Sequence, residues 1–389
     1  MRKALWLLLL LTAISIGGLT WLSRETPPPP PENTTVPVET LLADTSEEFA
    51  QVDEPWQFQF PADHGAHPNF RTESWYFTGN LATAQGRHFG FQLTFFRLAL
   101  TPEPPQSRSA WSAHQVYRSH FAVTDVATAQ FFAFERFSRA ALGLSGAQET
   151  PVTIWLENWV MKAPGVNGDP SVFHLQAAEN DIRIDLNLTS SKPAVLADNS
   201  GLFANGTGPG NAFYFYWLPR LTVQGTLQIK SEPFSVTGLA WLDRAWGDVS
   251  LTRGQLALNR FALQLNDGRE ILCFQLHRRD GSGIPITTAL LVSRDGTTQS
   301  FGRRELSLET LDYWTSSHDA SRYPARWQLH IPDAELELTI IPYLADQEMN
   351  FAIRYWGGAV RVSGQANGRS LRGSGYVELT GYGEHQAPR

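Results

Sequence analysis

The sequence predicts an all-β fold, built from two tandem antiparallel β-domains. Beyond Trp56, apolar and polar residues alternate in short runs, and no helical period is sustained. Such alternation places apolar side chains on one face of a strand, as in a sheet with one buried face. The composition agrees, since 12% of the residues are aromatic and such residues favour strands.

An internal duplication is the second observation behind this fold. Five segments of the first half resemble five segments of the second half in the same order, at 86–97 and 268–279, 122–132 and 291–301, 173–188 and 327–342, 220–225 and 359–364, and 238–247 and 375–383. The last pair, for example, is GLAWLDRAWG and GYVELTGYG. We therefore place two domains, at residues 56–249 and 250–385. Domains of this pattern are usually sandwiches or up-and-down barrels, and a small barrel can hold one ligand among inward-facing aromatic residues.

The N-terminal residues predict export. Arg2 and Lys3 precede an uncharged run at residues 4–23, and twenty helical residues span about 30 Å, roughly the thickness of the hydrocarbon layer. We expect residues 1–24 to be an uncleaved anchor in the inner membrane, with the rest of the chain on the periplasmic or extracellular side. A cleaved signal peptide is the alternative. Residues 25–55, with five consecutive prolines, predict a stiff spacer followed by disordered chain.

Composition and motifs exclude several functions. The 31 basic and 38 acidic residues leave no positive excess for nucleic acid. The G-x-S-x-G, P-loop and G-x-G-x-x-G motifs are missing from the sequence, so a serine hydrolase and a nucleotide enzyme are unsupported. The single cysteine, Cys273, lies among apolar residues and is expected to be buried and inert.

Asp243 is the strongest catalytic candidate. Asp243 and Trp241 share one face at the end of a predicted strand. In the alignment of the two copies, Glu378 stands opposite Trp241 and Thr380 opposite Asp243, so the second copy lacks an acid at the position of Asp243. If Asp243 faces an apolar cavity, desolvation raises its pKa and makes it a candidate proton donor.

Glu73 is the second candidate, because paired carboxyls can divide the acid and base roles. It shares a strand face with Trp75 and has no evident counterpart in the second copy. Structural pairing is the alternative for both acids. The candidate partners are Arg244 and Arg71 for Asp243, and Arg71 and Arg97 for Glu73.

A Gly/Pro-containing loop holds His64 and His67. Together with Glu73 they faintly resemble a set of metal-binding ligands. Zinc motifs of this kind usually sit on a helix or in a tight knuckle, so we expect no metal and a role at the mouth of the first barrel. Tyr214 and Tyr216 share one face of a strand rich in aromatic residues. That face either packs in the hydrophobic core or contacts a ligand. The candidate ligand-binding residues are His64, His67, Arg71, Trp75, Tyr214, Tyr216 and Trp246.

Four segments carry a family resemblance: FPADHGAHPNFRTESWYFTGNL, FGFQLTFFR, YFYWLPRLTVQGTL and GLAWLDRAWG. In combination they resemble the AttH/carotenoid 1,2-hydratase-like family, whose members are often described as secreted hydrolases. The resemblance covers about residues 56–383. It implies two lipocalin-like β-barrels, an envelope location and often a neighbouring ABC-type export system.

One branch of that family, the carotenoid hydratases, adds water across a terminal double bond without a cofactor. The resemblance implies an Asp that protonates the alkene beside aromatic residues, and the matching positions are Asp243 and Trp241. Tyr214 and Tyr216 stand where that branch has a His-x-Trp pair. The chain also has Ser74 where the family usually has Trp, and it has Ala245 where the family usually has Glu.

Three hypotheses follow from the sequence. The first, which we favour at this point, is a membrane-tethered protein that binds a lipophilic small molecule in its first barrel and serves an ABC-type exporter. The second is a cofactor-independent hydratase or hydrolase that uses Asp243 as general acid, with Trp241, Glu73 and either Tyr214 or Tyr216 assisting. The third is a structural envelope module whose barrels are filled by side chains.

Overall fold

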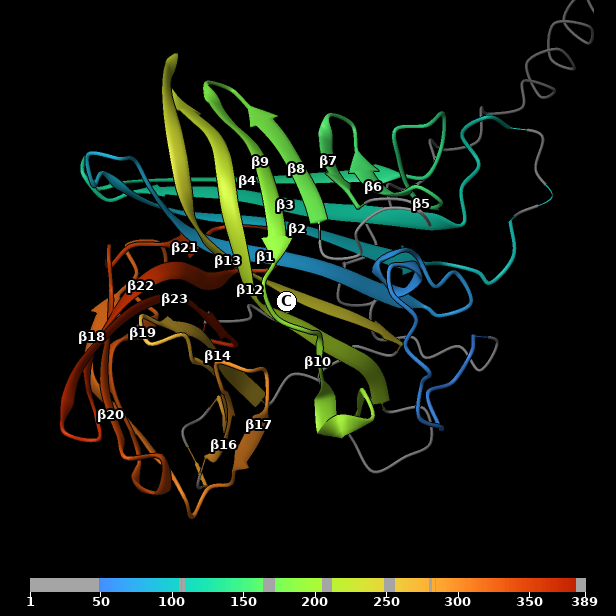
Figure 1. The fold of residues 1–389 in the computed structure, drawn as a ribbon. Coiled ribbons are helices and arrows are strands. Elements are labelled where there is room, and N and C mark those ends of the chain that lie inside the picture. Colours follow the sequence, from blue (N-terminus) through green and yellow to red (C-terminus); the bar gives the residue numbers. More distant parts are fainter. Residues whose placement is uncertain are drawn as a thin grey trace, which may run out of the picture. The chain divides into compact units, whose positions relative to one another are not determined.

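The computed structural model confirms the all-β prediction and contains two barrel-like antiparallel sheets (Figure 1). It describes residues 49–104, 106, 109–163, 172–204, 212–247, 256–279, 282, 283 and 285–382. The predicted anchor, most of the proline-rich spacer and the predicted domain boundary near residue 250 lie outside these residues. In the described part of the chain, no helix has the length and apolar character that a membrane span requires.

The first sheet, blue to yellow in Figure 1, forms the N-terminal barrel. Its strands follow in the order β4 (Gln130–Arg139), β3 (Gln115–Asp125), β2 (His88–Ala99), β1 (Thr72–Ala82), β13 (Glu232–Gly247), β12 (Ala212–Ile229), β9 (Ile182–Ser190), β8 (Val172–Glu179), β7 (Trp159–Lys162), β6 (Val152–Leu156) and β5 (Ser145–Glu149). β10 (Val195–Leu196) and β11 (Leu202–Ala204) also pair with β12, and η1 (Ala62–His64) and η2 (Ala197–Asn199) are single 3₁₀ turns. β6 lies against β2, β3 and β4, which brings the two ends of the sheet together.

The second sheet, gold to red in Figure 1, forms the C-terminal barrel. Its order is β17 (Thr298–Phe301), β16 (Ile286–Val292), β15 (Glu270–Arg278), β14 (Leu256–Leu265), β23 (Arg369–Thr380), β22 (Tyr355–Ala366), β20 (Leu336–Pro342), β19 (Arg322–Ile331) and β18 (Ser307–Thr315). β21 (Glu348–Met349) pairs with β22, and η3 (Pro332–Ala334) is a 3₁₀ turn.

The two sheets share one strand order, which agrees with the duplication found in the sequence. β14, β15, β16 and β17 take the places of β1, β2, β3 and β4, while β19, β20, β22 and β23 take those of β8, β9, β12 and β13. Each of the five matched segment pairs falls on equivalent strands. The similarity therefore reflects a repeated topology.

Side chains of the N-terminal barrel itself fill the described part of its interior. Trp75, Phe77, Phe91, Tyr216 and Trp246 point inward from four neighbouring strands, and each is at most 1% exposed. A side chain without accessible surface has no water-sized void beside it. The inward aromatic residues that we expected to line a ligand cavity therefore pack against one another at these positions.

The two barrels pack through their outer faces, with β1, β2 and β12 against β23, β22 and β14. An apolar seam between them includes Phe215, Trp217, Trp241 and Leu272. β2 is consequently buried on both faces, whereas its alternation predicted one buried face. Gly90 allows this close approach, because a Cβ there would lie 2.5 Å from the Cβ of Ala359.

Candidate functional site

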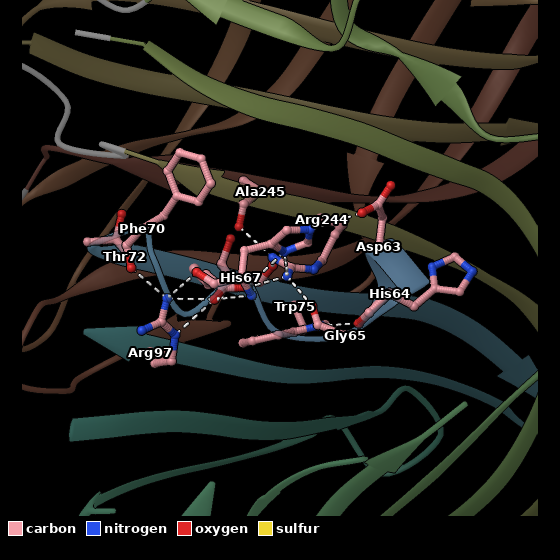
Figure 2. Close-up of polar contacts among 12 residues, drawn as sticks. Asp63, His64, Gly65, His67, Phe70, Thr72, Trp75, Arg97, Arg244 and Ala245 are labelled. Carbon is pink, nitrogen blue, oxygen red and sulfur yellow. Dashed lines mark hydrogen bonds and ion pairs between the residues drawn. The ribbon is translucent and has the colours of Figure 1, made fainter. Parts of the chain in front are cut away.

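A buried ion cluster lies inside the N-terminal barrel, where β1 begins (Figure 2). One oxygen of Glu73 accepts hydrogen bonds from Arg97 Nε at 2.9 Å and from the backbone N–H of His67 at 2.7 Å, and the other pairs with Arg244. Burial alone would raise the pKa of Glu73, but the two guanidinium groups outweigh it and hold the pKa well below its usual range. Glu73 is therefore an ionised structural acceptor. The sequence offers Arg71 and Arg97 as partners of Glu73, and the structure pairs Glu73 with Arg97.

His67 is fixed by the same cluster. Its Nδ1 lies 3.0 Å from a guanidinium nitrogen of Arg244 and 3.4 Å from Glu73 Oε2, and its Nε2 lies 3.1 Å from Asp63 Oδ1. Its ring stacks on Trp246, with the ring centroids 3.9 Å apart. Among the described residues, no group of three or more His, Cys, Asp or Glu side chains is arranged to hold a metal ion.

His64, Trp75 and Tyr216 form a neighbouring group. His64 Nδ1 lies 2.6 Å from the hydroxyl of Tyr216, and Trp75 Nε1 donates to the backbone carbonyl of His64 at 2.8 Å. Tyr214 donates to the backbone carbonyl of Glu54 at 2.8 Å. Most of the predicted ligand-binding residues are thus brought together, but as buried groups that hold the loop onto the barrel.

A pocket of ≈ 500 Å³ lies between this loop and the turn that joins β5 to β6. Trp56, Phe60, Phe70 and Val152 give it apolar walls, and His67 is the predicted ligand-binding residue that lines it. Arg71 lies just before β1, where its carbonyl accepts a hydrogen bond from Ala99. A ligand at this pocket would lie outside the packed interior of the barrel.

Asp243 and Trp241 lie on the opposite face of the sheet from Glu73. β1 pairs with β13 so that Glu73 stands opposite Trp246, and the Asp243 side chain points outward into the seam between the barrels. Trp241 Nε1 donates to one Asp243 oxygen at 2.8 Å, and Arg260 of β14 pairs with the other. Glu73 and Asp243 therefore do not form the carboxyl pair that the sequence suggested.

A second carboxyl, Glu378 of β23, faces Asp243 and Arg260 from the C-terminal barrel. Tyr76 belongs to the same group, since it stands opposite Asp243 where β1 pairs with β13 and the Arg260 guanidinium lies over its ring. Burial raises the pKa of Asp243, although Arg260 opposes the shift, and burial likewise raises the pKa of Glu378. Glu378 keeps some accessible surface, whereas Asp243 and Tyr76 are buried. We call Asp243, Glu378, Arg260 and Tyr76 the interface site.

A chain of hydrogen bonds leads from the interface site to the surface. Tyr76 lies 3.1 Å from Gln92 Oε1, and Gln92 Nε2 lies 2.7 Å from the hydroxyl of Tyr355. That hydroxyl lies 2.8 Å from His120 Nδ1, and His120 Nε2 lies 3.2 Å from Glu135 Oε1. The chain passes from the N-terminal barrel to Tyr355 of the C-terminal barrel and back.

The profile of the AttH-like family matches residues 51–382. The chain belongs to the AttH-like family. The crystal structure of a protein assigned as an AttH from Nitrosomonas europaea is similar to it, with 30% identity over 86% of this chain and 100% of that chain and a TM-score of 0.75. Kievitone hydratase from Nectria haematococca shares the fold at 15% identity, over 85% of this chain and 95% of that chain, with a TM-score of 0.63. No curated protein matches.

The sequence of this AttH-like protein contained one signal for the missed members of the interface site. Glu378 is an acid of the second copy that stands opposite Trp241 in the alignment, two positions before the residue that matches Asp243. Arg260 and Tyr76 carried no such signal. Arg260 reaches Asp243 because the outer faces of two sheets pack together, and a strand pattern does not specify that packing. Tyr76 stands opposite Asp243 where β1 pairs with β13, and the sequence pattern does not specify that pairing either.

His120 makes the stability of this AttH-like protein depend on pH. Burial lowers the pKa of His120 to about 4 from an ordinary value of 6.5. Between these values the unfolded chain binds a proton that the folded chain does not, so stability is present above 6.5 and is lost as the pH falls toward 4. We expect His120→Gln to reduce the slope of the unfolding free energy against pH in this window, measured by urea denaturation.

Burial also lowers the pKa of His88 to about 4, so part of the slope should remain in His120→Gln. An equal slope in wild type and His120→Gln would contradict the assignment.

Proposed function

We propose that this AttH-like protein adds water to a carbon–carbon double bond of an apolar substrate, or removes it, at the interface site. The observation that carries the proposal is the pair of carboxyls that two barrels bring to one interface, where Asp243 is buried and pairs with Arg260, and Glu378 stands opposite Arg260 on the neighbouring strand. Acid–base catalysis works best when the pKa lies near the operating pH, and burial raises the pKa of both carboxyls in that direction. The hydratase activity named for kievitone hydratase, which has the same fold, supports this proposal.

The chemistry needs no cofactor. One carboxyl gives its proton to an alkene carbon, which forms a C–H bond and leaves a cation on the other carbon. Water forms a C–O bond with that cation and releases a proton to a carboxylate of the pair, so the original protonation is restored. The aromatic ring of Trp241, whose Nε1 donates to Asp243, lies beside the site and can stabilise the cation.

Incubation in ¹⁸O-labelled water tests this function. The full-length protein is mixed with kievitone or with an acyclic carotenoid, and the products are analysed by mass spectrometry. We expect a product that has gained one molecule of labelled water, and no such product with the variant Asp243→Asn. Tight binding of either compound without labelled product would overturn hydration and leave a binding protein.

The ≈ 500 Å³ pocket beside Trp56 favours a second candidate function, the binding of a lipophilic molecule. This volume lies in the range of small-molecule sites. Phe60 and Phe70 would contact such a ligand, with His67 as a polar contact. Mass spectrometry of organic extracts of the natively purified protein tests this role. A Phe60→Ala variant should lose the extracted molecule, while an exposed Phe137→Ala control should keep it.

The location of the protein is a further part of the proposal. The uncharged run at residues 4–23 supports attachment to the inner membrane, with the barrels on the periplasmic or extracellular side. An ABC-type exporter is the proposed partner, on the basis of the family resemblance. Protease treatment of spheroplasts tests the orientation, since barrels exposed outside the membrane should be digested.

A further inference from the structure

We propose that the pocket beside Trp56 selects an organic cation, a molecule in which apolar groups surround a positively charged nitrogen. This inference rests on the second candidate function, the binding of a lipophilic molecule, and assigns a charge to that ligand. Three features lead to it, namely the acidic side chains in the pocket lining, the charge balance of the ion cluster beside the pocket, and the aromatic rings in its walls.

Acidic side chains contribute to the pocket lining. Asp63 and Glu149 line the pocket, and among the described residues the lining contains no lysine or arginine. Asp63 is buried and fixed, since its oxygens accept from Trp56 Nε1 at 3.3 Å and from the backbone N–H of Gln59. Glu149 is exposed, and in the described part of the chain its carboxylate has no hydrogen bond or ion pair. A ligand cation can therefore pair with Glu149 without breaking an existing contact.

The ion cluster beside the pocket has no spare positive charge when His67 is neutral. Its two guanidinium groups are matched by two carboxylates, those of Glu73 and Asp63, with His67 between Arg244 and Asp63. The carboxylate of Glu149 then adds one negative charge that no lysine or arginine of the described lining balances. An anionic ligand would be repelled by this charge, whereas a ligand with one positive charge would balance it.

The aromatic walls favour the same ligand. The rings of Trp56 and Phe70 stand nearly at right angles, at 74° with their centroids 6.0 Å apart, and Phe60 adds a third ring to the lining. Trp56 is only partly buried and Phe60 is 36% exposed, so both rings keep surface that a ligand can cover. The face of an aromatic ring attracts a cation beyond its apolar contact, because the ring quadrupole is negative there. A neutral lipophile would gain the apolar contact alone.

An inorganic cation fits this pocket less well than an organic one. Within the described residues, no three His, Cys, Asp or Glu side chains are grouped to hold a metal ion. A bare ion would also leave most of the ≈ 500 Å³ and the exposed aromatic surface uncovered. The lining therefore matches a lipophilic amine or a quaternary ammonium compound, whose apolar groups contact the rings while its nitrogen lies near the carboxylates.

The test compares two probes that have the same shape and differ in one charge. Phenyltrimethylammonium and its uncharged isostere tert-butylbenzene are titrated into the full-length protein, and their binding is measured by saturation-transfer NMR. We expect the cation to bind about 3- to 30-fold more tightly than the neutral compound, the range that cation–π contacts usually give. Phe60→Ala should weaken the binding of both probes, because it removes a ring that both of them contact.

Glu149→Gln should weaken the binding of the cation about threefold and leave that of tert-butylbenzene unchanged, since an exposed charge pair contributes little. Glu157→Gln is the matched control, because this carboxylate pairs with Arg136 and does not line the pocket. Equal affinity for the two probes, or equal cation affinity in Glu149→Gln and Glu157→Gln, would overturn the proposal. Equal affinity would still leave a site for neutral lipophiles, whereas binding of neither probe would also remove the second candidate function.

Discussion

Replacing Glu73 with glutamine is expected to lower the free energy of unfolding by about 3–5 kcal/mol, the usual cost of removing one partner from a buried charge pair. Glu73 is in contact with the guanidinium groups of Arg97 and Arg244, and all three side chains are buried. The glutamine leaves both positive charges without their counter-charge inside the barrel. Urea denaturation of the full-length protein measures the loss.

The matched control is Glu179→Gln, which removes a partly exposed carboxylate from Arg136. Exposed pairs contribute about 0–1 kcal/mol, so this variant should be close to wild type. Equal losses in the two variants would contradict the structural role of Glu73. Since its pKa is depressed in the folded state, its contribution is present above the ordinary value of 4.5 and is lost as the pH falls below it.

Replacing either interface carboxyl is expected to reduce hydration by about 10²–10⁴-fold, the usual contribution of a positioned acid or base. Asp243→Asn and Glu378→Gln preserve shape and remove the ionisable group. The fall should appear in kcat with little change in KM, because neither residue is the main apolar contact of the substrate. Initial rates with kievitone or an acyclic carotenoid measure it.

Two controls accompany these variants. Asp267→Asn replaces a carboxyl of the C-terminal barrel that pairs with Arg269 near the surface, and it should keep full activity. The second control is the double variant that carries both Asp243→Asn and Glu378→Gln. Its loss of transition-state stabilisation should be smaller than the sum of the two single losses, because residues that act as a unit lose their joint function in either single variant. Turnover at wild-type rate in either single variant would contradict a shared acid–base site.

Much of the fold could be predicted from the sequence, because strand alternation and the duplication are local in origin. The common face of Trp241 and Asp243 also followed from the two-residue period, and the hydrogen bond between them agrees with it. The sequence offers Arg244 and Arg71, both within the N-terminal domain, as partners of Asp243. The structure supplies Arg260 instead, from the first strand of the other barrel.

The candidate site could be predicted only in part, for a physical reason. Whether an aromatic residue such as Trp75 or Tyr216 lines a cavity or fills it depends on how many large side chains share the interior, which alternation does not report. Glu73 and the loop histidines are close together as expected. Their mutual hydrogen bonds, rather than a ligand, explain why polar groups are buried there.

Deuterium transfer from solvent to carbon tests whether the interface carboxyls perform acid–base chemistry. Kievitone is incubated in D₂O with wild type, Asp243→Asn, Glu378→Gln and Asp267→Asn, and deuterium on carbon is followed by NMR. We predict that wild type and Asp267→Asn form a new carbon–deuterium bond in step with hydration, and that the other two variants form it at least about 100-fold more slowly. Equal deuterium transfer by Glu378→Gln and wild type would contradict the proposed acid–base site.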